Sequence, residues 1–293
     1  MIENFRSEKF EASAWFHTLR DEIVARFESI EQLHKSSSPP ARFEVNETKR
    51  TSKDGSDAGG GLMSVMKNGR VFEKVGVNIS TVFGELGAQA QEAMMARKGF
   101  LGMREDPRFW ASGISVVAHM QNPHCPAVHM NTRMFWTPSA WWFGGGSDLN
   151  PCIEYPEDTA QFHSVLEAHC APHGADLYPR YKAWADEYFY VPHRKRARGV
   201  GGVFYDDHCT DDWRKDFAFT QDVGRAFLLA YAPLVEAQLE RTWDAADRET
   251  QLIHRGLYAE YNLIYDRGTR FGLETGHDPD AVLMSLPPLA KWA

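Results

Sequence analysis

The chain has 293 residues, of which 43% are hydrophobic and 13% aromatic, and its net charge is −8 at pH 7. This composition predicts a globular protein with a large core, and the acidic balance argues against binding to nucleic acid or to an anionic membrane surface. No apolar run approaches the roughly 20 residues that span a bilayer, and the acidic N-terminus does not resemble a signal peptide, so we expect a cytoplasmic protein without a membrane span.

The first predicted elements are a long helix and a polar loop. Residues 7–33 predict an amphipathic helix, because apolar side chains recur every three or four positions. These side chains are Phe16, Leu19, Ile23, Phe27 and Ile30. Residues 35–61 are rich in serine, proline, glycine and charged residues, and we expect a mobile surface loop there, because such a segment buries little apolar surface. A loop of this length is commonly functional or disordered, and covering a substrate is one role for it.

Strands and helices then follow in blocks. Asn68-Gly69 can supply the positive φ angles of a tight turn, so residues 62–83 predict a β-hairpin. A second hairpin is predicted at 112–136, further strands at 141–151, 199–206 and 258–266, and helices at 86–98, 157–171, 175–189, 211–240 and 246–257. Because strict β–α–β alternation is absent, we expect a single α+β domain over residues 1–293 with a large, mainly antiparallel β-sheet.

The second hairpin carries two different faces. Period-two alternation places a mostly polar row of side chains on one face and an apolar row on the other. The polar face reads Ser115, Val117 and His119 on the first strand and His129, Asn131 and Arg133 on the second. Such a row is typical of the floor of a site for a polar, anionic small molecule. The alternative is a half-solvated strand pair with its wet face outward.

Charged residues near this face and near the C-terminus are candidates for ligand binding. Arg133 and Arg267 are expected to bind carboxylates, because a guanidinium forms a paired, planar contact with a carboxylate. Asp266, in the predicted turn Asp266-Arg267-Gly268, could accept hydrogen bonds from N–H groups of a ligand or act as a base. The alternative is an ordinary turn aspartate.

Four histidines from separate predicted elements could converge on a metal ion: His119, His129, His163 and His193. They lack HExxH or any other local metal spacing. For His163 the alternative is a hydrogen-bonded position at the edge of the core. For His193 we weigh a solvated basic turn equally with an anion contact.

The sequence lacks the motifs of several other kinds of site. The run Gly144-Gly145-Gly146 could let the backbone approach a ligand, but it lacks the spacing of a nucleotide-binding loop. A GxSxG motif is absent, which argues against covalent acyl chemistry. Cys125, Cys152, Cys170 and Cys209 are widely spaced, and we expect reduced, structural thiols.

Segments from about residue 59 to the C-terminus resemble one family, the oxygen-dependent coproporphyrinogen III oxidases. In family order they are GGGLMSVMKNGRVFEKVGVNIS, SGISVVAHMQNP, HMNTRMFW, WWFGGGSDLNP, KAWADEYFYVPHRKRARGVGGVFYDD, YNLIYDRGTRFGLETG and LMSLPPLAKW. The run KxW, EYFY, HR, RGVGG and F-aromatic-D is highly specific. The resemblance therefore covers most of the chain.

The resemblance implies an oxidase that requires no redox cofactor and uses molecular oxygen as co-substrate. It converts the ring A and B propionates of coproporphyrinogen III to vinyls and gives protoporphyrinogen IX in haem biosynthesis. The implied fold is a broad antiparallel sheet flanked by helices on both faces. The implied assembly is a homodimer with C-terminal segments at the interface.

The resemblance also implies roles for individual residues. The implied substrate contacts are Ser115, Asn131, Arg133 and Gly276, and the implied catalytic residues are His129 as a proton donor, Asp266 as the group that holds the pyrrole N–H groups, and Arg267. His119, His129, His163 and His193 correspond to ligands of a divalent metal ion proposed in some members. His277 and Asp278 replace residues usual in the family, so one propionate contact is not carried over.

Two other functions stay open at this point. A non-catalytic tetrapyrrole-binding protein would keep the pocket without turnover. A histidine-metal oxidoreductase or hydrolase would use the histidines as ligands.

Overall fold

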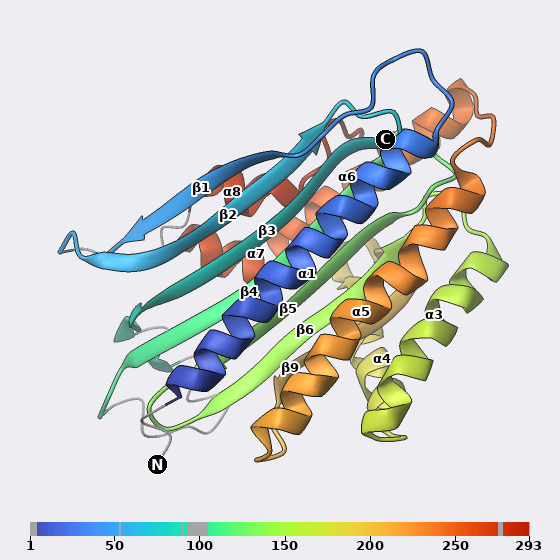
Figure 1. The fold of residues 1–293 in the computed structure, drawn as a ribbon. Coiled ribbons are helices and arrows are strands. Elements are labelled where there is room, and N and C mark those ends of the chain that lie inside the picture. The colour runs from blue at the N-terminus through green and yellow to red at the C-terminus, as the bar shows by residue number, and fades with distance from the viewer. Residues whose placement is uncertain (1–4, 53, 89–90, 93–104, 275–277, 293) are drawn as a thin grey trace.

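A seven-stranded antiparallel sheet forms the centre of the molecule in a computed structural model, which describes residues 5–52, 54–88, 91–92, 105–274 and 278–292 (Figure 1). In spatial order its strands are β1 (Glu44–Thr51), β2 (Asp57–Lys67), β3 (Phe72–Glu85), β4 (Arg108–Met120), β5 (Ala127–Trp136), β6 (Trp141–Asn150) and β9 (Gly201–His208). The short strands β7 (Tyr190–Val191) and β8 (Arg196–Ala197) pair with each other. Sheet and helices together confirm the predicted α+β class.

Helices cover both faces of the sheet (Figure 1). On one face lie α1 (Arg6–Leu33), α5 (Trp213–Gln238) and, beside α5, α3 (Pro156–Cys170). On the other face lie α6 (Ala245–Ile264), α7 (Arg267–Glu274) and α8 (Pro279–Val282), while α4 (Leu177–Tyr188) packs along β9. Single 3₁₀ turns are η3 (Ala171–His173), η4 (Pro192–Arg194) and η5 (Leu283–Ser285). Within the described residues, no helix is long and apolar enough to span a bilayer.

The main core lies between the sheet and the α1–α5 layer. The predicted helix over 7–33 is confirmed, and its apolar stripe is fully buried against the sheet. From the sheet, Val116 and Met130 enter the same core with 0% exposure. Burying these side chains stabilises the fold by roughly 25 cal/mol for each Å² of apolar surface removed from water. All four cysteines are free thiols.

The first predicted hairpin is confirmed as β2 and β3, with a wider turn than expected. The turn spans residues 68–71, and Asn68 takes a left-handed φ of 55°. The amide of Gly69 donates to the carbonyl of Phe72 at 2.8 Å.

Two predictions about elements are wrong. Nearly half of the expected loop at 35–61 is strand, because β1 pairs with β2 from Glu44 onward and satisfies its backbone groups there. The expected strand at 258–266 is the last part of α6 and the residues after it. Its buried residues Tyr258, Tyr261 and Asn262 follow a helical period, which outweighs the β propensity of its aromatic residues. The helix expected at 86–98 falls largely outside the described residues.

Candidate functional site

The polar face predicted for the second hairpin lies on β4 and β5. Directly opposed residues of antiparallel strands share a face, and Ser115 pairs with Asn131 while Val117 pairs with His129. The C-terminal elements cover this face near β3 and β4: Asn78 Nδ2 donates to the carbonyl of Ala281 at 3.1 Å. The C-terminal elements thus cover part of this face, while Ser115, His129, Asn131 and Arg133 stay partly exposed.

His129 is held by a buried ion pair. Its Nδ1–H donates to Oδ1 of Asp148 at 2.8 Å, and Asp148 is held by Arg198 through Nη2 at 2.7 Å and Nε at 3.1 Å. Burial alone would raise the pKa of Asp148, but Arg198 and His129 outweigh it, so this pKa lies below its usual range. Because Nδ1 is engaged, Nε2 of His129 accepts from Nδ2 of Asn131 at 3.2 Å. Nε2 is thus the imidazole nitrogen on the side of Asn131.

Arg198 is itself surrounded by aromatic rings. Its guanidinium carbon lies 4.4 Å from the ring centroid of Phe189, 4.5 Å from that of Tyr261 and 4.7 Å from that of Tyr258. Its Nη1 donates to Oδ1 of Asn262 at 2.7 Å. A charge that is 2% exposed is stable only when it is paired and hydrogen-bonded, and Asp148 and Asn262 meet that requirement.

Two arginines meet at one buried aspartate. Asp206 on β9 is 5% exposed, and its Oδ1 accepts from Nη2 of Arg133 on β5. Its Oδ2 lies 3.4 Å from Nη1 of Arg267, the first residue of α7. Burial lowers the pKa of Arg133, but Asp206 raises it by more, so the net shift is upward. The structure therefore brings together the two arginines that the sequence proposed for carboxylate binding.

Gly144 on β6 makes room for Arg133. A Cβ atom at this position would lie 3.0 Å from Nη2 of Arg133 and 3.1 Å from its Cζ. The glycine run in β6 thus serves a side chain of the neighbouring strand, with which Gly144 is directly paired.

Asp266 begins α7 rather than a turn. Its Oδ2 accepts from the amide of Thr269 at 2.7 Å, as in a helix N-cap, and its Oδ1 accepts from the hydroxyl of Tyr188 at 3.1 Å. Burial and then Asp266 raise the pKa of Tyr188, so its hydroxyl stays protonated and donates. Burial lowers the pKa of Arg133 and Asp206 raises it, and the charge of Asp266 adds to the upward shift.

The four candidate metal ligands have separate partners. Nε2–H of His119 donates to the carbonyl of Ser285 at 2.9 Å, and His129 is bonded to Asp148 as described. His163 Nε2–H donates to the carbonyl of Val200 at 3.0 Å and Nδ1 accepts from Tyr178, while His193 contacts Glu260 and Tyr265. Across the described part of the chain, no group of three or more His, Cys, Asp or Glu residues is placed to hold a metal ion. These four histidines do not form a metal site.

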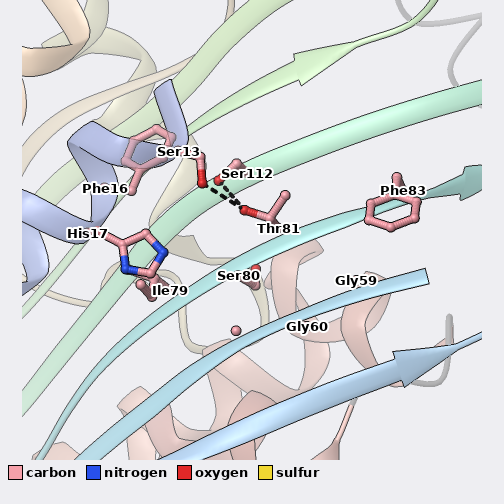
Figure 2. Close-up of a pocket in the computed structure, with 11 residues that line it drawn as sticks. Ser13, Phe16, His17, Gly59, Gly60, Ile79, Ser80, Thr81, Phe83 and Ser112 are labelled. Carbon is pink, nitrogen blue, oxygen red and sulfur yellow. Dashed lines mark hydrogen bonds between the residues drawn. The ribbon is translucent and has the colours of Figure 1, made fainter. Parts of the chain in front are cut away.

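A separate pocket of about 240 Å³ lies on the opposite side of the sheet (Figure 2). Ser13 of α1, Thr81 of β3 and Ser112 of β4 form a chain of hydroxyls there, with oxygen separations of 3.3 and 2.8 Å. None of the candidate site residues lines this pocket. Gly276 and its neighbour His277 lie outside the described residues, and Asp278 caps α8 through the amide of Asp280 at 2.9 Å.

Comparisons with known proteins agree over nearly all of the chain. A family model described as Coproporphyrinogen III oxidase matches residues 11–293. The oxygen-dependent coproporphyrinogen-III oxidase of Rickettsia bellii (strain RML369-C) is 47% identical over 283 residues, which are 96% of this chain and 97% of that protein. The protein of the same name from Rickettsia africae (strain ESF-5) is 46% identical over 96% of each chain. The chain belongs to the coproporphyrinogen III oxidase family.

Sequence reasoning on this coproporphyrinogen III oxidase family member missed three residues that organise the site. Asp148, Arg198 and Asp206 lie inside segments that carried the resemblance: WWFGGGSDLNP, RGVGG and F-aromatic-D. The feature that could have identified them in the sequence is a charged residue next to a glycine-rich or aromatic strand. A charged side chain that is buried needs a partner of opposite charge. For Asp148 the partners are Arg198 and His129, and for Asp206 they are Arg133 and Arg267.

Proposed function

We propose that this chain carries out the reaction of its family, the oxidative decarboxylation of the ring A and B propionates of coproporphyrinogen III to vinyls, giving protoporphyrinogen IX in haem biosynthesis. Each propionate consumes one O₂ and releases one CO₂ and one H₂O₂. The observation that carries the proposal is the match to the family over residues 11–293, with 47% identity to a curated relative.

The site supplies groups that suit this substrate. Coproporphyrinogen III has four carboxylates, and the guanidiniums of Arg133 and Arg267 concentrate positive charge inside an acidic protein. Ser115 and Asn131 are opposed on the same face of the sheet and serve as further polar contacts. Gly276 remains part of the proposed contact set.

Asp266 is proposed to act on the pyrroles. A carboxylate has about four lone-pair positions, and Tyr188 and Thr269 each take one of those on Asp266. The others are available to accept or remove pyrrole N–H protons, which makes the ring electron-rich enough to react with O₂. O₂ then bonds to a ring carbon, and the resulting peroxide takes the β-hydrogen of the propionate as a proton. The electrons of that C–H bond form a double bond to the ring and break the ring C–O bond, so that HOO⁻ leaves and takes up a proton to give H₂O₂. CO₂ then leaves, the C–C electrons form the vinyl, and the pyrrole nitrogen regains its proton from Asp266.

His129 is proposed to carry a proton at Nε2. Asp148 accepts from Nδ1–H, and this bond orients the ring and stabilises a positive imidazolium when Nε2 gains a proton. Arg198 keeps Asp148 ionised for this role. No step is assigned to a metal ion, because the four candidate histidines do not gather around one point.

We further propose that the chain works in the cytoplasm as a homodimer. Apolar side chains of the C-terminal region are well exposed, among them Leu289 at 57% and Trp292 at 60%. Large exposed apolar groups close together in a region favour an interface with another chain.

The experiment supplies anaerobically prepared coproporphyrinogen III to the purified chain under air and under argon. We expect protoporphyrinogen to form only under air, with one O₂ consumed for each vinyl formed. Binding of the substrate without oxygen uptake would identify a carrier instead of an enzyme.

A further inference from the structure

The two arginines of the site share one buried carboxylate. Arg133 and Arg267 come from β5 and α7, and two guanidiniums this close to one point would repel each other without an anion between them. Asp206 supplies that anion, and each of its oxygens faces a different arginine. The side chain of Asp206 is 6% exposed, whereas those of Arg133 and Arg267 are 35% and 40% exposed.

This geometry leaves both guanidiniums able to bind a ligand. A guanidinium has five N–H donors, and the contact with Asp206 involves one Nη atom of each arginine. Arg267 is fixed further by the ring of Tyr188, whose centroid lies 4.7 Å from its Cζ. The arginines are thus held from the buried side, while their partly exposed sides can meet carboxylates.

We propose that Asp206 is a positioning residue that fixes Arg133 and Arg267 at separate places, one at each carboxylate oxygen, so that each guanidinium receives a different propionate of the substrate. The inference rests on the proposed function. Without Asp206, the two guanidiniums would repel each other and lose these fixed places. The macrocycle would still bind, but the reacting propionate would lose its orientation.

The test compares Asp206→Asn with Asp207→Asn. Both variants remove one negative charge from β9, but Asp207 is exposed whereas Asp206 is buried. For Asp206→Asn we expect kcat to fall about 10-fold while KM changes less than about twofold, because orientation is lost and charge attraction is kept. Asp207→Asn should match the wild type.

The second readout is the intermediate with one vinyl and three propionates. After the first decarboxylation the enzyme must bind this intermediate through three carboxylates instead of four. If Arg133 and Arg267 are displaced, the intermediate should therefore dissociate before the second decarboxylation. We expect Asp206→Asn to accumulate this intermediate in solution and the wild type to convert it onward. If Asp206 only stabilised the fold, Asp206→Asn would lower the fraction of enzyme that is active without changing the ratio of intermediate to product.

The outcomes separate the inference from the proposed function. If the wild type forms no vinyl product, the proposed function fails. If the wild type is active and Asp206→Asn keeps its kcat and product ratio, only the role of Asp206 is overturned. Should Asp206→Asn fail to fold, Asp206→Glu keeps the charge and moves the carboxylate by one methylene; it should also release the intermediate, and wild-type behaviour in it would overturn the proposal.

Discussion

At the scale of single residues, the site depends on carboxylates that already have partners within the protein. Asp148 orients His129, Asp206 contacts two arginines, and Asp266 caps α7. Each of them sets the position or charge state of a group proposed to meet the substrate. Substitutions at these carboxylates should therefore change turnover more than they change substrate affinity.

Asp266→Asn is predicted to lower kcat by about 100-fold, the scale of a lost acid–base group. Asparagine is also a good N-cap, so α7 should persist while the negative charge next to the pyrroles is lost. The matched control is Asp244→Asn, which changes the N-cap of α6 in the same way on the exposed surface. Full turnover of Asp266→Asn in the anaerobically prepared substrate assay would remove Asp266 from the mechanism.

The buried side chain of His119 should make the stability of the fold depend on pH. Complete burial, followed by the charge of Arg255, lowers the pKa of His119 from 6.5 to about 3. The unfolded chain therefore takes up a proton at this histidine below pH 6.5, while the folded chain does so only near pH 3, and stability falls as the pH falls through that window. At pH 5 the loss is about 2 kcal/mol.

The variant His119→Gln should lack this part of the acid sensitivity, while its amide can still donate to the carbonyl of Ser285. The measurement is urea unfolding of both proteins at pH 7 and pH 5. We expect the wild type to lose more unfolding free energy between the two pH values. Equal losses would show that the proton uptake occurs elsewhere.

At the scale of elements, α1 does more than cover the sheet. Glu31, near its C-terminal end, is 0% exposed and accepts from the amides of Val71 and Phe72 at Oε1 and from that of Arg70 at Oε2, each at 2.8 Å. One helix side chain thus satisfies the backbone donors where the turn enters β3.

Glu31→Gln should lower the unfolding free energy by about 2 to 3 kcal/mol, because its amide group would face backbone N–H donors and leave them unpaired. The control is Glu22→Gln on the exposed side of the same helix, for which we expect a change within about 0.5 kcal/mol. Chemical denaturation measures both. A similar loss in the two variants would contradict the role of Glu31 at this turn.

At the scale of the whole molecule, one face of the sheet forms the main core and the other carries the site. Helices α1 and α5 pack on the first face, while α6, α7 and the elements after them lie over the second (Figure 1). This division allows imidazole, guanidinium and carboxylate groups to lie deep in the protein without interrupting the main core.

The proposed homodimer predicts a mass of about twice the 33.3 kDa of the chain in sedimentation equilibrium at micromolar concentration. Leu289→Asp should weaken this association, because it places a charge among the exposed C-terminal apolar residues. Leu229→Asp is the control, since Leu229 is 56% exposed on α5. A monomeric wild type, or dissociation by Leu229→Asp alone, would contradict the proposed interface.

The sequence by itself determined the local parts of this protein. Helical spacing predicted α1, and period-two alternation placed His129, Asn131 and Arg133 on one face of β5, because both patterns follow from the backbone geometry of a single element. The same logic failed for residues 258–266, where β-favouring side chains lie on a helix because their burial follows the helical period.

Only the tertiary structure decided which charged groups meet. Asp206 lies 73 residues after Arg133 in the chain, and Arg198 lies 50 residues after Asp148, so no local pattern relates them. Their contacts arise because β5, β6 and β9 are neighbours in the sheet and α7 lies next to them. Burial then leaves each charge a stable position only beside an opposite charge.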